Sequence, residues 1–146
     1  MSKSIWRPGT VLYPVPAVMV SCGTVEKPNI ITVAWCGTLC TLPAMTYISI
    51  RPERFSYKII EESKEFVINL TTESLARSVD YCGVKSGRDT NKFKDCSLTA
   101  AKSMKVSAPS IEESPVNIEC RVTQTIKTGG THDIFIAEVL SVSVDD

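Results

Sequence analysis

Short apolar runs separated by turn residues dominate the first third of the chain. Residues 16–22 and 30–36 are apolar and β-rich, and the segment 23–29 between them is rich in residues that form turns. Runs of this length, bounded by Gly, Pro and Asn, are typical of strands. The pattern therefore predicts a strand, a loop and a second strand.

Strict alternation appears at residues 45–51. The side chains of Thr46, Ile48 and Ile50 fall on one face, and those of Tyr47, Ser49 and Arg51 fall on the other. Successive side chains of a strand point to opposite sides of a sheet. One face of this strand is therefore expected to be wet or to face a ligand.

The rest of the chain mixes helical and strand patterns. Helices are predicted at 56–63, after Pro52, and at 72–80, which ends near Gly83. The polar, glycine-punctuated segment 82–92 predicts a loop with a brief helical turn at Asp89. Strands are predicted at 65–70, 116–123 and 134–144, the last two forming a long hairpin around the turn at 128–131.

These elements define the fold class. At least six strands with two or three short helices, and no regular β-α-β alternation, predict a mostly β, antiparallel barrel with helical excursions. A chain of 146 residues fits a single domain spanning 1–146. Its size allows roughly 70% of the surface of the unfolded chain to be buried, so disulfides are not required.

Charge and hydropathy exclude several functions. Sixteen Lys and Arg balance sixteen Asp and Glu, which argues against nucleic acid and a polybasic membrane anchor as partners. No apolar run approaches the ~20 residues of a membrane helix. The apolar stretch 11–22 is a poor signal peptide because Pro14 and Pro16 interrupt it. We therefore expect a soluble, cytoplasmic protein.

The familiar catalytic and metal-binding patterns are missing. There is neither a Rossmann fingerprint nor a P-loop, and His132 is the only histidine, which disfavours a Ser-His-Asp hydrolase. We expect no metal site, although Cys36 and Cys40 have a zinc-like spacing. Because Cys22, Cys36 and Cys120 lie in apolar strand-like runs, we interpret them as buried thiols.

Two basic, hydroxyl-bearing stretches remain, at 49–56 and 86–92. A phosphate group is held by Arg or Lys side chains, hydroxyls and free amides at glycine turns, and each charge-assisted bond contributes about 1.5–3 kcal/mol. Each stretch is therefore a candidate phosphate site. The alternative is that both are solvated basic loops.

Seven segments in order resemble the flavin reductase-like, FMN-binding split-barrel family, and its flavoredoxin branch most closely. The match runs almost from end to end. The segments are PVPAVMVSC (14–22), PNIITVAW (28–35), SIRPERFS (49–56), EFVINL (65–70), DYCGVKSGRDTNKF (80–93), PVNIEC (115–120) and GTHDIFIAEV (130–139).

The resemblance implies a Greek-key-like split β-barrel that forms a homodimer with one FMN, held noncovalently, per subunit. It places Asn29, Thr32, Val33, Ala34 and Trp35 around the isoalloxazine ring. It places Ser49, Arg51, Ser86, Gly87 and Lys92 around the phosphate and ribityl chain, with Arg54, Ser56 and Arg88 as less certain additions. His132, as the candidate catalytic residue, is expected near the flavin and the second substrate, although a strand-end histidine can equally bond a loop carbonyl.

The function implied is an oxidoreductase that takes a hydride from NADH or NADPH and passes electrons to free flavin or to a protein acceptor. One alternative is a flavoredoxin-like electron carrier without its own NAD(P)H site. Another is a barrel that binds a different phosphate-bearing ligand or haem without redox turnover. We also expect the cysteines not to be the redox centre, because none forms a Cys-x-x-Cys pair.

Overall fold

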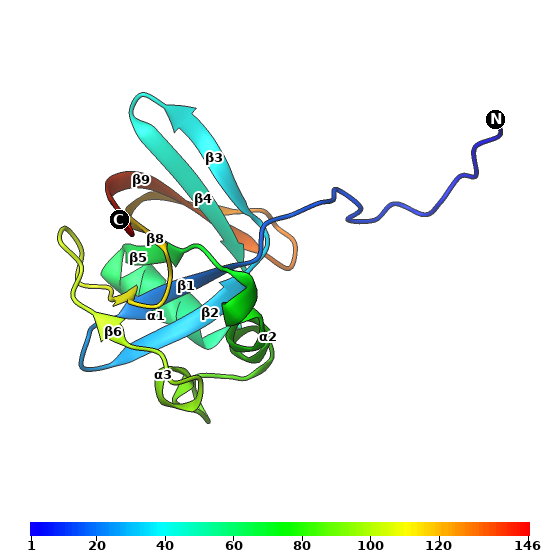
Figure 1. The fold of residues 1–146 in the computed structure, drawn as a ribbon. Helices are drawn as coiled ribbons and strands as arrows, with labels where there is room; N and C mark the ends of the chain where they lie inside the picture. Colours follow the sequence, from blue (N-terminus) through cyan, green and yellow to red (C-terminus); the bar gives the residue numbers. More distant parts are fainter.

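Seven strands form one antiparallel sheet in the computed structural model, which describes residues 1–146 (Figure 1). The strand order is β2-β1-β5-β8-β9-β4-β3. The strands are β1 (Val18–Gly23), β2 (Pro28–Val33), β3 (Cys36–Thr41), β4 (Ala44–Ile50), β5 (Glu65–Asn69), β8 (Val116–Lys127) and β9 (Asp133–Val144). The mostly β, antiparallel class predicted from the sequence is confirmed.

Short helices and a small second sheet complete the chain. They are α1 (Phe55–Ser63), η1 (Glu73–Leu75), α2 (Ala76–Val84), α3 (Lys92–Asp95), β6 (Ala100–Ala101) and β7 (Ser110–Ile111). Residues 1–17 form an arm without secondary structure that leads away from the body (Figure 1). No helix has the length and apolarity needed to cross a membrane.

Local sequence explains how the sheet turns and bends. Gly23 closes the β1–β2 hairpin at φ +86°, and a Cβ there would lie 2.3 Å from the carbonyl oxygen of Lys27, so only glycine fits. The β8–β9 hairpin shifts register at Glu119/Cys120 and again at Val122/Gln124. Such irregularities increase the twist of a sheet, which allows these long strands to curl.

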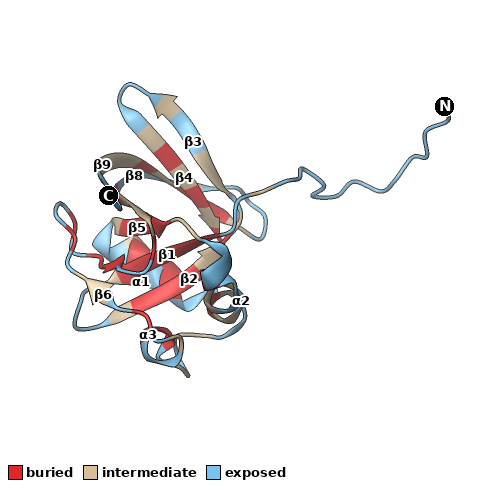
Figure 2. Ribbon diagram, in the orientation of Figure 1, coloured by how far each residue is buried: buried red, intermediate tan, exposed pale blue.

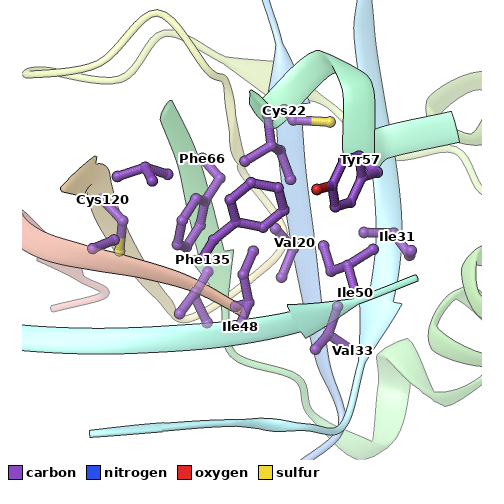
Figure 3. Packing of buried hydrophobic residues seen from close by; sticks show 14 of the residues in the cluster. Val20, Cys22, Ile31, Val33, Ile48, Ile50, Tyr57, Phe66, Cys120 and Phe135 are labelled. Carbon is purple, nitrogen blue, oxygen red and sulfur yellow. The ribbon is translucent and has the colours of Figure 1, made fainter. Parts of the chain in front are cut away.

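The main core fills the inside of this curled sheet. Phe66, Phe135, Val20 and Ile48 are almost fully buried and point toward one another, with Tyr57 of α1 packing against Phe135 (Figure 3). Burial alternates along β4 and the first half of β9, as the sequence pattern predicts, whereas β1 and β5 are buried on both faces. Figure 2 shows buried segments along the strands of the body, while the arm is almost entirely exposed.

A second apolar cluster attaches the small helices to the outer face of β1 and β2. Met19 and Ile30 project outward and pack with Leu75, Cys82 and Phe93 from η1, α2 and α3. Gly83 allows α2 to approach β2 closely, because a Cβ there would lie 3.3 Å from the Cβ of Thr32. These contacts place the loop between α2 and α3 beside β2.

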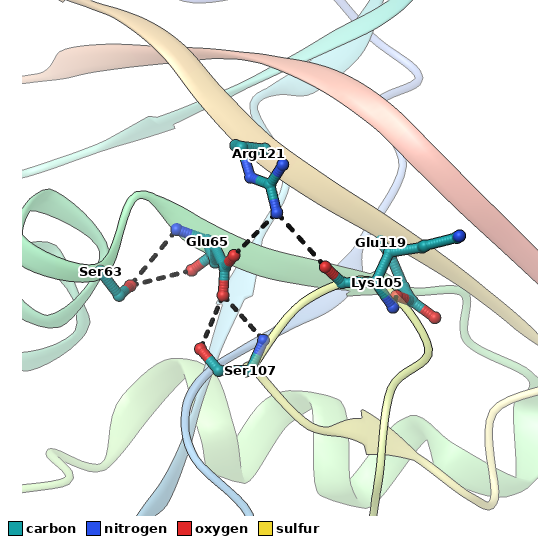
Figure 4. A network of polar contacts seen from close by, with 6 residues as sticks. All are labelled: Ser63, Glu65, Lys105, Ser107, Glu119 and Arg121. Carbon is teal, nitrogen blue, oxygen red and sulfur yellow. Dashed lines mark hydrogen bonds and ion pairs between the residues drawn. The ribbon is translucent and has the colours of Figure 1, made fainter.

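Two carboxylates of the sheet, Glu65 and the buried Glu119, hold the loop that precedes β7. Glu65 of β5 accepts hydrogen bonds from the amide and hydroxyl of Ser107 and pairs with Arg121 of β8 at 3.2 Å (Figure 4). Glu119 accepts the amides of Met104 and Lys105. The loop is therefore fixed by acceptors on the sheet rather than by its own secondary structure.

Three local predictions were wrong. The strand predicted at 30–36 ends at Val33, so Trp35 lies in a connection and Cys36 begins β3, a strand that the sequence pattern did not reveal. Cys36 is half-buried and not a core thiol. The helical turn predicted at Asp89 is a plain turn, and α3 begins at Lys92 because Asn91 caps it by accepting the amide of Lys94.

Candidate functional site

Two adjoining cavities lie at the ends of β2 and β4. The residue before β9 and the loops that follow α2 and β4 complete their walls. The first, of about 160 Å³, we call the ring cavity. The second, of about 240 Å³, we call the cationic groove. Ile31, Arg51 and Arg54 line both, so the two cavities share part of their wall.

Trp35 forms the open wall of the ring cavity. Its carbonyl accepts the amide of Ser49 at 2.9 Å, which joins the β2–β3 connection to β4. Its indole ring contacts the imidazole of His132 with centroids 4.6 Å apart and an interplanar angle of 46°. The indole remains 39% exposed. A flat aromatic ligand can therefore pack beside it.

His132 is placed by the start of β9. The next residue, Asp133, is buried and accepts a 2.6 Å hydrogen bond from the hydroxyl of Tyr57. The Nδ1 atom of His132 lies 2.9 Å from the Thr131 hydroxyl. Partial burial and the nearby Arg51 guanidinium lower the pKa of His132 below 6.5, so the imidazole is neutral at pH 7.

The cationic groove lies between the start of α1 and the loop after α2. Its charged lining consists of one acid, Glu53, and five cations, namely Arg51, Arg54, Lys85, Arg88 and Lys92. Arg88 is held by donating to the carbonyl of Glu53 at 3.1 Å, and Arg51 pairs with the Glu53 carboxylate at 3.5 Å. This excess of positive charge, with the hydroxyls of Ser56 and Ser86, suits a phosphate group.

Gly87 brings the loop into close contact with the body. A Cβ at this position would lie 2.1 Å from Oδ1 of Asn29 and 2.6 Å from Cδ1 of Phe55. Asn29 is buried and donates through Nδ2 to the Ser56 hydroxyl at 2.7 Å. Asn29 therefore supports the groove from behind and does not line it.

Lys92 is more buried than a surface phosphate ligand would be. Only 5% of it is exposed, and its Nζ donates to the carbonyls of Ile30 and Cys82 at 2.7 and 2.8 Å. Burial lowers the pKa of its ammonium group. Lys92 thus joins β2, α2 and α3, and one of its three N–H donors remains for a ligand in the groove.

The predicted binding residues come together, with roles divided between ligand and fold. The hydroxyl of Thr32 donates a hydrogen bond to the carbonyl of Val79 in α2, so it can only accept a hydrogen bond from a ligand. All predicted cofactor-binding residues except Asn29 line one of the two cavities, and so do His132, Arg54, Ser56 and Arg88. Sequence analysis did not name six further lining residues as site residues, namely Ile31, Ile50, Glu53, Phe55, Cys82 and Lys85. The position of Lys85 directly before Ser86 in the basic loop was the available signal for one of them.

No three His, Cys, Asp or Glu side chains lie close enough together to hold a metal ion. All six cysteines are free. Burial raises the pKa of Cys22 to about 11 and that of Cys120 to about 12, which keeps both thiols protonated at neutral pH.

The aromatic wall at Trp35 and the cations of the groove together form a candidate site for a flat ring that carries a phosphate. A family described as "Flavin reductase like domain" matches residues 10–146, and the chain belongs to it.

Known proteins resemble this chain over most of its length. An uncharacterized protein of Archaeoglobus fulgidus is 38% identical over 135 residues, which is 92% of this chain and 75% of that protein. The flavoredoxin of Desulfovibrio vulgaris (Miyazaki F) has a TM-score of 0.91 and 32% identity, covering 100% of this chain and 78% of that one. The reductase component of a 4-nitrophenol monooxygenase from Rhodococcus opacus is 29% identical over 109 residues, 75% of this chain and 55% of that protein.

Proposed function

We propose that the chain binds FMN noncovalently, with the isoalloxazine ring in the ring cavity and the phosphate in the cationic groove. The observation that carries this proposal is the wall that the two cavities share. An apolar aromatic wall at Trp35 leads directly to the cations at Arg51 and Arg54. The donor chemistry fits the cofactor, because the groove offers guanidinium, ammonium and hydroxyl groups to a dianion.

We further propose that the protein is an NAD(P)H:flavin oxidoreductase. FMN, when bound, supplies the ability to accept a hydride from NADH or NADPH and to pass its electrons to free flavin or to a protein acceptor. The residues of this chain position the cofactor and offer it an apolar surface. Trp35 and Ile31 offer apolar surface to one side of the ring cavity, and His132, neutral at pH 7, is able to exchange a proton at its rim.

A flavoredoxin-like electron carrier is the second candidate. The similarity to the flavoredoxin of Desulfovibrio vulgaris favours it. In that case the site retains FMN tightly and has no productive nicotinamide position. We propose a homodimer for either function, because β3 leaves one edge of the sheet without a partner strand and the ring cavity opens at the surface.

The deciding experiment records the absorption spectrum of the purified protein and then its oxidation of NADH and NADPH with and without added FMN. A reductase is expected to bind FMN and turn over either nucleotide. Bound flavin without turnover, together with electron exchange with a redox dye, supports the carrier. A protein that stays colourless with excess FMN contradicts both and leaves a barrel for another phosphate-bearing ligand or haem.

A further inference from the structure

Cys82 and Cys96 lie at the two ends of the segment that carries most of the cations of the groove. Cys82 belongs to the last turn of α2 and lines the cationic groove, and Cys96 directly follows α3. Lys85, Arg88 and Lys92 lie in the chain between them. Both thiols are free. A bond between the two sulfur atoms would therefore close a ring around the basic segment 83–95.

Three hydrogen bonds hold the end of α2 against α3. The hydroxyl of Tyr81 in α2 donates to the carboxylate of Asp95 in α3 at 2.7 Å. The ammonium group of Lys92 donates to the carbonyl of Cys82 at 2.8 Å, and the carbonyl of Lys92 accepts the amide of Cys96 at 3.0 Å. The residues directly before the two cysteines are thus bonded to each other, and both cysteines are bonded to the same lysine.

The side chains of the two cysteines meet in the apolar cluster between the helices and the sheet. Cys82 is buried in this cluster, and Cys96 packs against it. Burial and the charge of the neighbouring Cys96 raise the pKa of the Cys82 thiol, and a hydrogen bond between the two side chains contributes. Cys22, which also lies near Lys92, packs in the main core inside the barrel instead. Cys96 is therefore the partner that the fold gives to Cys82.

We propose that Cys82 and Cys96 form a reversible disulfide bond when hydrogen peroxide oxidises the protein. The half-buried Cys96 is the sulfur that the peroxide reaches, because Cys82 is only 1% exposed. The Cys96 thiolate attacks one peroxide oxygen, the O–O bond breaks, and a sulfenic acid and one water are formed. The Cys82 sulfur, releasing its proton, then attacks the Cys96 sulfur, and the sulfenic oxygen leaves as a second water. The two thiols lose two electrons and two protons in total, and the peroxide is reduced to two waters.

The disulfide would hold the segment 83–95 at both ends. Lys85 and Arg88 of this segment are exposed and belong to the charged lining of the groove. A ring closed at Cys82 and Cys96 limits the motion of their backbone, so less entropy is lost when a phosphate group binds. We therefore expect the oxidised protein to hold FMN more tightly. This consequence rests on the proposed function, whereas the formation of the disulfide does not.

The test treats the full-length protein with hydrogen peroxide, blocks the remaining thiols with iodoacetamide and digests the product with trypsin without reduction. Cleavage after Lys and Arg releases Cys82 in peptide 78–85 and Cys96 in peptide 95–102. We expect mass spectrometry to find these two peptides joined, lighter by two hydrogen atoms than their sum, and separated again by dithiothreitol. Non-reducing electrophoresis is expected to show the band of a single chain, because the bond lies within one chain.

Two single-cysteine variants provide the comparison. Cys96→Ser removes one half-buried thiol of the proposed pair, and Cys40→Ser removes a half-buried thiol of β3. We expect Cys40→Ser to form the joined peptides as the wild type does, and Cys96→Ser to leave Cys82 as a free thiol. Unjoined peptides in the treated wild type, joining only between two chains, or joining of Cys82 to another cysteine overturns the proposal.

A second measurement separates this inference from the flavin proposal. Fluorescence titration measures FMN affinity in the reduced and the peroxide-treated forms of the wild type and of Cys96→Ser. We expect oxidation to strengthen FMN binding by about threefold or more in the wild type and to leave Cys96→Ser unchanged. Equal affinities of the reduced and the disulfide-bonded wild type overturn the tightening. Absence of FMN binding in both forms of a wild type that does form the disulfide overturns the flavin proposal and retains the disulfide.

Discussion

The ammonium group of Lys92 donates a 2.7 Å hydrogen bond to the backbone carbonyl of Ile30. This contact ties the first residue of α3 to the middle of β2. The Cys82 carbonyl accepts a second bond at 2.8 Å. Lys92, which the sequence suggests as a phosphate ligand, therefore also holds the sheet to the helices that carry the basic loop.

Replacing Lys92 with Met is expected to lower the free energy of unfolding by about 1–3 kcal/mol, because two buried carbonyls lose their donor. The matched control is Lys94→Met, which removes an exposed cation from the same helix. Urea denaturation followed by circular dichroism measures both. Equal midpoints for the two variants would show that the Lys92 bonds contribute nothing to stability.

Arg51→Ala is expected to weaken FMN by about 1.5–3 kcal/mol, roughly ten- to over a hundredfold, because a charge-assisted bond to the phosphate is lost. Riboflavin lacks the phosphate and is expected to lose far less affinity. Lys58→Ala, which removes an exposed cation of α1 outside both cavities, is the control for net charge. Fluorescence titration measures each ligand, and equal losses for FMN and riboflavin would remove Arg51 from the phosphate site.

Gly87→Ala is expected to displace the loop after α2, because its new Cβ would overlap Asn29 and Phe55. We expect a loss of FMN affinity of at least tenfold and a destabilisation of about 1–3 kcal/mol. Gly130→Ala is the control, since a Cβ there meets nothing closer than 3.5 Å. Affinities and melting temperatures that match between the two variants would contradict the close packing at Gly87.

Elements with a strong local pattern were predictable from sequence. The sequence of the β8–β9 hairpin alternates at 116–123 and 134–144 on either side of one turn, so both strands were found, although their two register shifts were not. β3 was missed because Cys36–Thr41 has little alternation and half of it faces solvent. Its place depends on pairing with β4 across an irregular register. That pairing is a tertiary contact that no short window of sequence contains.

The side chains that gather around the candidate site could be predicted from the sequence, but the bonds that they make to the rest of the fold could not. The family resemblance named residues that do gather around two cavities. It could do so because matching whole segments in order also matches the individual residues within each segment. It did not reveal that Lys92 reaches Ile30, or that Thr32 donates to Val79, because each bond joins elements distant in the sequence. Such contacts between elements distant in the sequence decide whether a polar side chain is free to bind a ligand or is bonded to the rest of the fold.

The double variant Cys36→Ser, Cys40→Ser is expected to retain the flavin spectrum and NAD(P)H oxidation within about twofold. The two thiols are free and belong to the projecting strand β3. Neither cysteine lines the ring cavity or the cationic groove. Loss of both properties in a folded double variant would make these thiols part of the redox site.

The pH dependence of stability is expected to report on His132. Burial and the charge of Arg51 lower the pKa of the folded imidazole below its ordinary value of 6.5. Between pH 6.5 and the lowered pKa the unfolded chain therefore binds more protons than the folded chain, so stability falls as the pH drops through this window. His132→Asn removes the titrating group, and its melting temperature is expected to fall less than that of the wild type between pH 7.5 and 5.5. Scanning calorimetry at both pH values measures the two differences, and an identical fall in both proteins would mean that His132 has the same proton affinity folded and unfolded.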